Sequence, residues 1–234
     1  MLEKYVMQKK FTVNNYMKTY KEYDKKKTQI NEGLISKQGG VDIRKKISDW
    51  CHEQKIERFT INDDLTIEAS DVKIIRYTGA ELPDYIQFGA CGAFALLGCD
   101  NLKSLRGCPT SCDFEFKLLK CPKIETLEHS PSKCASLRLD HCDSLTSLKG
   151  APKLDWSRDL IYVEGCLEIR NCSSLKNLVG GPNHCRSLTI EACPGLTSLK
   201  GAPKIIEKNA TVSAPLVKKI LGLSDKASLQ LTHL

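Results

Sequence analysis

The sequence predicts an α/β solenoid, in which short units stack on one another and pair their strands in parallel. Residues 142–152, CDSLTSLKGAP, return almost unchanged at 193–203 as CPGLTSLKGAP. The same positions recur around three further cysteines. One such unit cannot bury its own leucines, whereas stacked units bury a continuous core. The repeated segment is therefore interpreted as a structural unit and not as a duplicated site.

Each unit is counted from an anchor cysteine. The five anchors lie 22, 21, 30 and 21 residues apart: Cys99, Cys121, Cys142, Cys172 and Cys193. Apolar residues stand five and three positions before each anchor, and three and six positions after it. Glycine stands eight positions after the anchor, except where His129 replaces it, and proline stands ten positions after.

The spacing within a unit predicts its local structure. Apolar residues that alternate with polar ones before the anchor predict a short strand with one buried face. The leucines after the anchor do not have the period of a strand, so we expect a helical or 3₁₀ turn on the opposite wall. Glycine permits an unusual backbone angle, and proline ends the return segment. The frame predicts parallel strands near 94–97, 116–119, 137–140, 167–170 and 188–191.

The pattern L-x-L-x-x-C-x-x-L-x-x-L resembles the cysteine-containing leucine-rich repeat. This resemblance implies a curved solenoid with short parallel strands on its concave face. LTSLKGAP, preceded by WCHEQKIERFTINDDLTIEASDV at 50–72, is similar to leucine-rich-repeat proteins of tailed bacteriophages, over roughly residues 43–205. It implies no particular activity. The third unit is nine residues longer than its neighbours, and we expect the extra residues, within 153–165, to bulge from one edge.

Four regions are expected. Residues 1–40 form a basic helical leader, and 41–76 form an amphipathic helix followed by irregular capping rungs. Residues 77–205 form the repeat solenoid, and 206–234 form a C-terminal cap, with a helix around 215–223, and a tail. In the second region, Ile43, Ile47 and Trp50 share one helical face after Asp42. Asp63 and Asp64 mark a hairpin turn between two short strands.

The positive charge is concentrated at the N-terminus. Residues 1–50 hold twelve Lys/Arg against six Asp/Glu, whereas the other residues hold 23 against 22. Such a leader can meet nucleic acid or an acidic protein, or can simply be a solvated helix face. The sequence has no secretory signal, and it has no apolar run of the length that spans a membrane. We therefore expect no membrane partner and a reducing compartment.

Residues 17–34, MKTYKEYDKKKTQINEGL, resemble the capsid-targeting leader of internal head proteins in T-even-like phages. The resemblance implies cleavage at Ile30-Asn31-Glu32, before Gly33. Sixteen residues precede Met17, whereas such leaders begin the chain, so either Met17 is the true start or the likeness is accidental. The expected location is the virion, its head interior included, or the host cytoplasm.

The cysteines follow the repeat period, which favours a structural role as two buried columns. The anchors form one column, and Cys91, Cys134 and Cys185 form the other. Cys108-x₃-Cys112 and Cys166-x₅-Cys172 leave zinc as an alternative, and a reactive or disulfide-forming pair is another. We expect neither a metal nor a cofactor.

Catalytic motifs are missing from the sequence. His141 and His184 each stand beside a cysteine, but those cysteines belong to the two columns, which disfavours a Cys–His nucleophile. The pair Asp63–Asp64 has no evident partner for acid–base work. We therefore expect no catalytic residues and no enzyme activity; an enzyme with an unrecognised site is the least favoured alternative.

The predicted binding surface is the outward side of the strands. Residues four and two positions before each anchor point away from the core. We expect a protein partner there, and the candidate contacts are Leu97, Lys117, Leu119, Arg138, Asp140, Glu168 and Arg170. Two alternatives stay open. The leader could fold back over Leu97 and Leu119, or the chain could be an internal head protein that meets nucleic acid through its basic leader.

Overall fold

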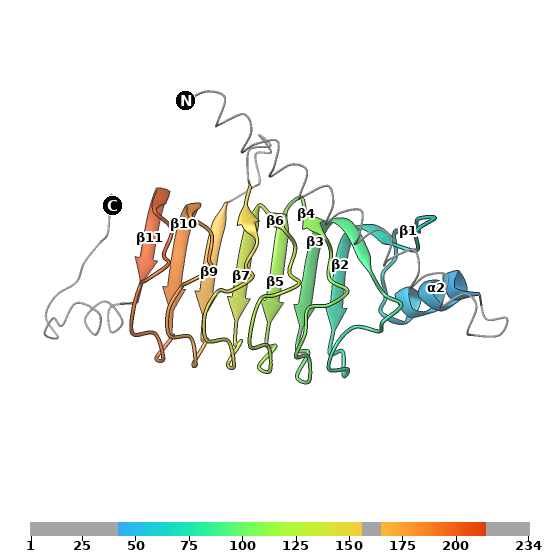
Figure 1. The fold of residues 1–234 in the computed structure, drawn as a ribbon, viewed down its shortest axis with the longest axis horizontal. Helices are drawn as coiled ribbons and strands as arrows, with labels where there is room; N and C mark the ends of the chain where they lie inside the picture. The colour runs from blue at the N-terminus through green and yellow to red at the C-terminus, as the bar shows by residue number, and fades with distance from the viewer. Residues whose placement is uncertain (1–41, 156–164, 214–234) are drawn as a thin grey trace, which may run out of the picture. The chain divides into compact units, whose positions relative to one another are not determined.

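The computed structural model describes residues 42–155 and 165–213. From Ile47 onward they form a β-solenoid of about six turns, with stacked parallel strands and one short helix (Figure 1). The main sheet runs in the order β1, β2, β3, β5, β7, β9, β10, β11, and the short β4 pairs with β3. The predicted leader, the bulge at 156–164 and the helix around 215–223 lie outside the described residues.

The strands follow the repeat closely. The long strands of the main sheet are β2 (Ile67–Ile75), β3 (Phe88–Leu97), β5 (Glu115–Leu119), β7 (Ser136–Asp140), β9 (Cys166–Arg170), β10 (His184–Glu191) and β11 (Ile205–Val212). From β2 to β11 every neighbouring pair is parallel. All five predicted strands and their parallel pairing are confirmed. The residues five before each anchor stand in one row, from Phe94 through Phe116, Leu137 and Leu167 to Leu188.

Of the two alternatives expected for the wall opposite the sheet, a helical or a 3₁₀ turn, the helical one is not found in the part of the chain that the structure describes. Between the strands of the described repeats there are turns and no helix, so the α/β assignment is not supported; the fold is a β-solenoid. Single turns close at the anchors, where the amide of Leu102 donates to Cys99 and that of Leu145 donates to Cys142. Other amides on this wall donate to the adjacent rung, as Lys176 does to Thr146. Because bonds between rungs use these groups, a helix ladder does not form.

The glycine position behaves as predicted. Gly107, Gly150, Gly180 and Gly201 all have φ between 86° and 88°, and His129 has φ 67° at the equivalent place. A Cβ on Gly150 would lie 2.5 Å from the backbone nitrogen of Glu128 in the preceding rung. Gly150 therefore needs glycine both for its backbone angle and for close stacking, whereas the rung of His129 accepts a side chain at the equivalent place.

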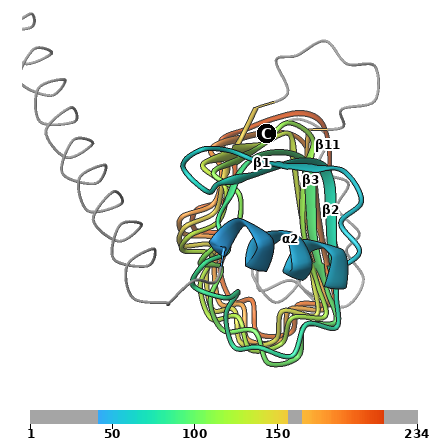
Figure 2. The same cartoon turned by 90° about the vertical axis from the view of Figure 1, so that its right-hand side faces the viewer.

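The first end of the stack is covered. Helix α2 (Ile43–Glu53) is capped by Asp42, whose side chain accepts a hydrogen bond from the amide of Arg44. From Ile47 onward the helix lies against the first rungs (Figure 2), and Ile47, Trp50 and Cys51 are buried. The Trp50 ring lies 6.4 Å from that of Phe88, which continues into the repeat core at Phe94.

Short strands complete the structure. β1 (Phe59–Ile61) pairs antiparallel with β2, which confirms the predicted hairpin at Asp63 and Asp64. β4 (Ser111–Cys112) extends the sheet beside β3. β6 (Lys133–Cys134) and β8 (Lys153–Leu154) form a separate parallel pair. Among the described residues, no helix has the length and apolar character needed to cross a membrane.

Candidate binding face

The seven predicted contact residues lie on one face of the sheet. Leu97, Leu119, Asp140 and Arg170 are register partners across β3, β5, β7 and β9. Lys117, Arg138 and Glu168 form a second row of register partners. The residues between these positions, such as Leu118 and Leu139, are fully buried. The alternation read from the sequence therefore separates the core from an outer face.

The charged residues of this face bind one another. Arg138 Nε lies 2.6 Å from a carboxylate oxygen of Glu115 and 3.4 Å from one of Glu168. Lys117 Nζ lies 2.5 Å from Glu115. Arg170 continues the series, 3.0 Å from Glu168 and 3.1 Å from Glu191. We call these six residues the ion-pair ladder: Lys117, Glu115, Arg138, Glu168, Arg170 and Glu191.

The ladder has three positive and three negative members, so it is neutral as a group. Asp140 lies beside it and is engaged too: His141 Nδ1 is 2.8 Å away, and the amide nitrogen of Asn171 donates to the same carboxylate at 2.8 Å. Because these charges are matched within the sheet, the central rungs have little charge left for a partner. Sequence reasoning missed the role of Glu115, which stands six positions before its anchor.

An apolar group precedes the ladder. Ile75 is the register partner of Leu97, which is in turn the partner of Leu119. We call these three residues the apolar strip; Ile75 is 56% exposed, and the two leucines are half-buried. Ile75 was missed because β2 lies outside the cysteine frame. The alternation of buried Val72 and Ile74 with exposed neighbours is the signal that could have placed it.

Cations border the strip on both sides. Lys73 and Lys117 stand in the next row toward the strand starts, and Arg76 and Lys120 directly follow Ile75 and Leu119. Lys73, Arg76 and Lys120 are exposed and form no ion pair with another described residue. A hollow of about 340 Å³ adjoins the strip at the strand ends, and its lining includes Arg76, Lys120 and one acid, Asp100. We call it the strand-end hollow.

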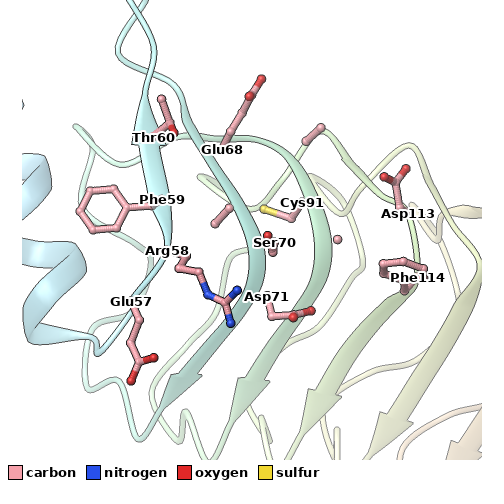
Figure 3. Close-up of a pocket in the computed structure, with 13 residues that line it drawn as sticks. Glu57, Arg58, Phe59, Thr60, Glu68, Ser70, Asp71, Cys91, Asp113 and Phe114 are labelled. Atoms are coloured by element: carbon pink, nitrogen blue, oxygen red, sulfur yellow. The ribbon is translucent and has the colours of Figure 1, made fainter.

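A larger hollow of about 750 Å³ lies beside β1, β2 and β3 (Figure 3). Its lining contains one cation, Arg58, and four acids: Glu57, Glu68, Asp71 and Asp113. It also contains Cys91, but burial raises the pKa of that thiol to about 12, so the thiol is neutral at pH 7. No histidine lines this hollow. Cys91 therefore has no imidazole base in the lining of this hollow.

The two cysteine columns are structural in their geometry. Each anchor thiol contacts backbone carbonyls: Cys142 Sγ lies 3.6 Å from the oxygen of Leu118 in the preceding rung and 3.9 Å from that of Asp140. All five anchors are buried. In the second column, burial raises the pKa of Cys91, Cys134 and Cys185 to about 12. These thiols stay protonated near neutral pH, and the anchors donate to carbonyl groups.

Within residues 42–155 and 165–213, no group of three or more His, Cys, Asp or Glu side chains is arranged to hold a metal ion. Cys166, from the Cys166-x₅-Cys172 pair, instead lies 3.0 Å from the hydroxyl of Ser187.

The fold and the outer face define a β-solenoid repeat protein with an apolar and ion-paired sheet surface. Comparison of the chain with protein-family models, curated proteins and solved structures found no match.

Proposed function

We propose that this chain is a non-catalytic protein-binding module of the leucine-rich-repeat type. The observation that carries the proposal is the apolar strip, in which Ile75, Leu97 and Leu119 are stacked across three strands on the outer face of the sheet. A solenoid presents such a face as a continuous surface. Apolar side chains that gather into a patch mark a contact more often than scattered ones do.

The strip is the centre of the proposed contact, and the ladder is its neighbour. A partner would gain from the apolar surface of the strip and would leave the ladder's internal pairs intact. This narrows the sequence-based hypothesis, whose candidate contacts also included the charged residues Arg138, Asp140 and Arg170. Arg138 already lies between two carboxylates, so its replacement would disturb the sheet as well as a contact.

The test is selection of a displayed random-peptide library against the full chain. Enriched peptides are then measured against Ile75→Asp, which places a charge at the most exposed point of the strip. Peptides that bind the native chain but no longer bind the Ile75→Asp variant support the proposal. An absence of any peptide that is sensitive to Ile75→Asp would reject it.

We further propose that the module is encoded by a tailed phage and acts in the virion or on a host factor. The repeat wording LTSLKGAP and the segment 17–34 support this proposal. Mass spectrometry of purified virions tests it: the chain should be present, and cleavage after Glu32 would leave Gly33 as the mature N-terminus. Virions that lack the chain would leave the host factor as its partner.

A further inference from the structure

We propose that the partner is an acidic amphipathic helix that lies across β2, β3 and β5, with apolar side chains on the strip and a carboxylate in the strand-end hollow. This inference rests on the proposed function and names the chemistry of the partner. It draws on the spacing of the strip, the charge around it and the position of the hollow.

Spacing favours a helix that crosses the strands. Neighbouring strands lie about 4.8 Å apart, so the three residues of the strip, one on each strand, span roughly 9.6 Å. Successive turns of an α-helix repeat every ~5.4 Å, so two turns cover about the same length. In an extended segment, residues on one face recur only every ~6.7 Å, so they no longer match the strip at its third residue. Apolar residues three and four positions apart on a helix would therefore each contact one residue of the strip.

Charge favours acidic flanks on that helix. Lys73 lies on one side of the strip, and Arg76 and Lys120 lie on the other; all three are exposed. None of them pairs with a described carboxylate, in contrast to the ladder residues. Acidic side chains on both flanks of the helix would find a cation on each side of the strip.

The hollow gives one carboxylate a defined place. Arg76, Gly98 and Lys120 line the hollow. They directly follow the three strip residues, at the ends of β2, β3 and β5, so Gly98 lies between the two cations. Thr78 and Asn101 line it as well, and Lys123 Nζ donates to the Asn101 side-chain oxygen at 2.8 Å. That contact occupies the acceptor of Asn101 and leaves its amide nitrogen as a donor. Two cations and this donor outweigh Asp100 for an anionic guest.

The same charges argue against the chain's own leader as the occupant. Residues 1–40 contain nine lysines and four acidic residues, so the leader carries an excess of positive charge. Its approach to Lys73, Arg76 and Lys120 would place like charges together. An acidic partner outside this chain has the complementary charge.

Two synthetic peptides test the proposal directly. One is an amphipathic helix of about four turns, with a leucine stripe and glutamate flanks. The other has lysine in place of every glutamate. Fluorescence anisotropy with the full chain should show at least about tenfold tighter binding of the acidic peptide. Equal or tighter binding of the basic peptide overturns the proposal.

Variants place the contact. Arg76 and Lys120 have φ of 54° and 56°, so asparagine, which tolerates this backbone region, is the matched neutral replacement. Arg76→Asn with Lys120→Asn should weaken the acidic peptide about three- to tenfold. Lys200→Asn, at an exposed lysine on the wall opposite the sheet, is the control and should leave the affinity for the acidic peptide unchanged. An equal loss of affinity in the double variant and in Lys200→Asn, or no loss in the double variant, overturns the assignment of the carboxylate to the hollow.

The library selection separates this inference from the proposed function. Enriched peptides that are acidic, helical and sensitive to Ile75→Asp support both. Enriched peptides that depend on Ile75 but are basic or extended overturn the helix and leave the binding face. If no enriched peptide depends on Ile75, the binding face itself is rejected.

Discussion

A Cβ placed on Gly150 would lie 2.5 Å from the backbone nitrogen of Glu128, one rung earlier. Gly98 also has a positive φ, 65°, but its Cβ would meet only the Arg76 Cγ at 3.6 Å. The two glycines therefore have the same kind of backbone angle and different surroundings. At Gly150 the rungs themselves exclude a side chain.

This difference predicts unequal costs for the same substitution. Gly98→Ala should lower the free energy of unfolding by roughly 0.5–1 kcal/mol, the cost of the left-handed backbone less the chain entropy that alanine saves. Gly150→Ala should cost about 1–3 kcal/mol more, because backbone atoms have to move. Urea denaturation of both variants measures the difference. Equal costs would show that the stack relaxes easily at Gly150.

The residue before each anchor offers the opposite experiment. Gly98, Lys120, His141, Asn171 and Ala192 all have positive φ. Ala192 is exposed, so Ala192→Gly should raise stability by about 0.5–1 kcal/mol, the strain relieved less the entropy lost. Ala202→Gly is the control, because Ala202 is not among the positive-φ residues, and it should lower stability slightly. A fall in the denaturation midpoint of Ala192→Gly would contradict this account.

Leu148 tests the repeat core. Its side chain is fully buried six positions after Cys142. Leu148→Ala should lower the free energy of unfolding by about 2–5 kcal/mol, because it leaves a cavity between rungs. Val179, which is 42% exposed on the same wall, provides the comparison, and Val179→Ala should have little effect. An unshifted midpoint for Leu148→Ala would place this residue outside the core.

Arg138 tests the ion-pair ladder. Arg138→Ala leaves Glu115 and Glu168 without their shared cation and should cost roughly 1 kcal/mol at low salt. Only part of the loss should disappear at about 1 M salt, because Arg138, Glu115 and Glu168 are partly buried and salt screens such pairs less than exposed ones. Lys149→Ala breaks an isolated, exposed pair with Glu128 and serves as the control, with no expected change in midpoint. A loss for Arg138→Ala that is independent of salt would indicate packing and not charge.

The buried thiols predict a loss of stability at high pH. Burial raises the pKa of Cys134 from 9.0 to about 12, as it does for Cys91 and Cys185. Between these values the unfolded chain releases the thiol proton and the folded chain retains it, so unfolding becomes more favourable as pH rises. Each such thiol contributes about 1.4 kcal/mol per pH unit in this window.

Urea midpoints measured from pH 7 to 10.5 under reducing conditions check this expectation. Stability should be nearly constant below about pH 8 and should fall above pH 9. Cys134→Ala removes one titrating group, so its stability should fall less steeply above pH 9, whatever its value at pH 7. The same slope in both proteins would mean that Cys134 ionises while folded.

The sequence by itself determined the repeat, the five strands, their parallel order and the sidedness of each strand. Periodicity carries this information because a residue five positions before an anchor meets the same environment in every rung. The sequence also identified Gly150 and its equivalents as positions with an unusual backbone angle. Asp42 and the shared face of Ile43, Ile47 and Trp50 predicted helix α2, since capping and amphipathic spacing are local properties.

Only the tertiary structure decided what the opposite wall and the outer face are made of. The turns after each anchor are not helical, because amides such as that of Lys176 bond to the neighbouring rung, and no local pattern records that competition. The pairing of Arg138 with Glu115 and Glu168, and the alignment of Ile75 with Leu97, depend on the register between strands. Register is set by the stacking of whole rungs, so it joins residues that are far apart in the sequence.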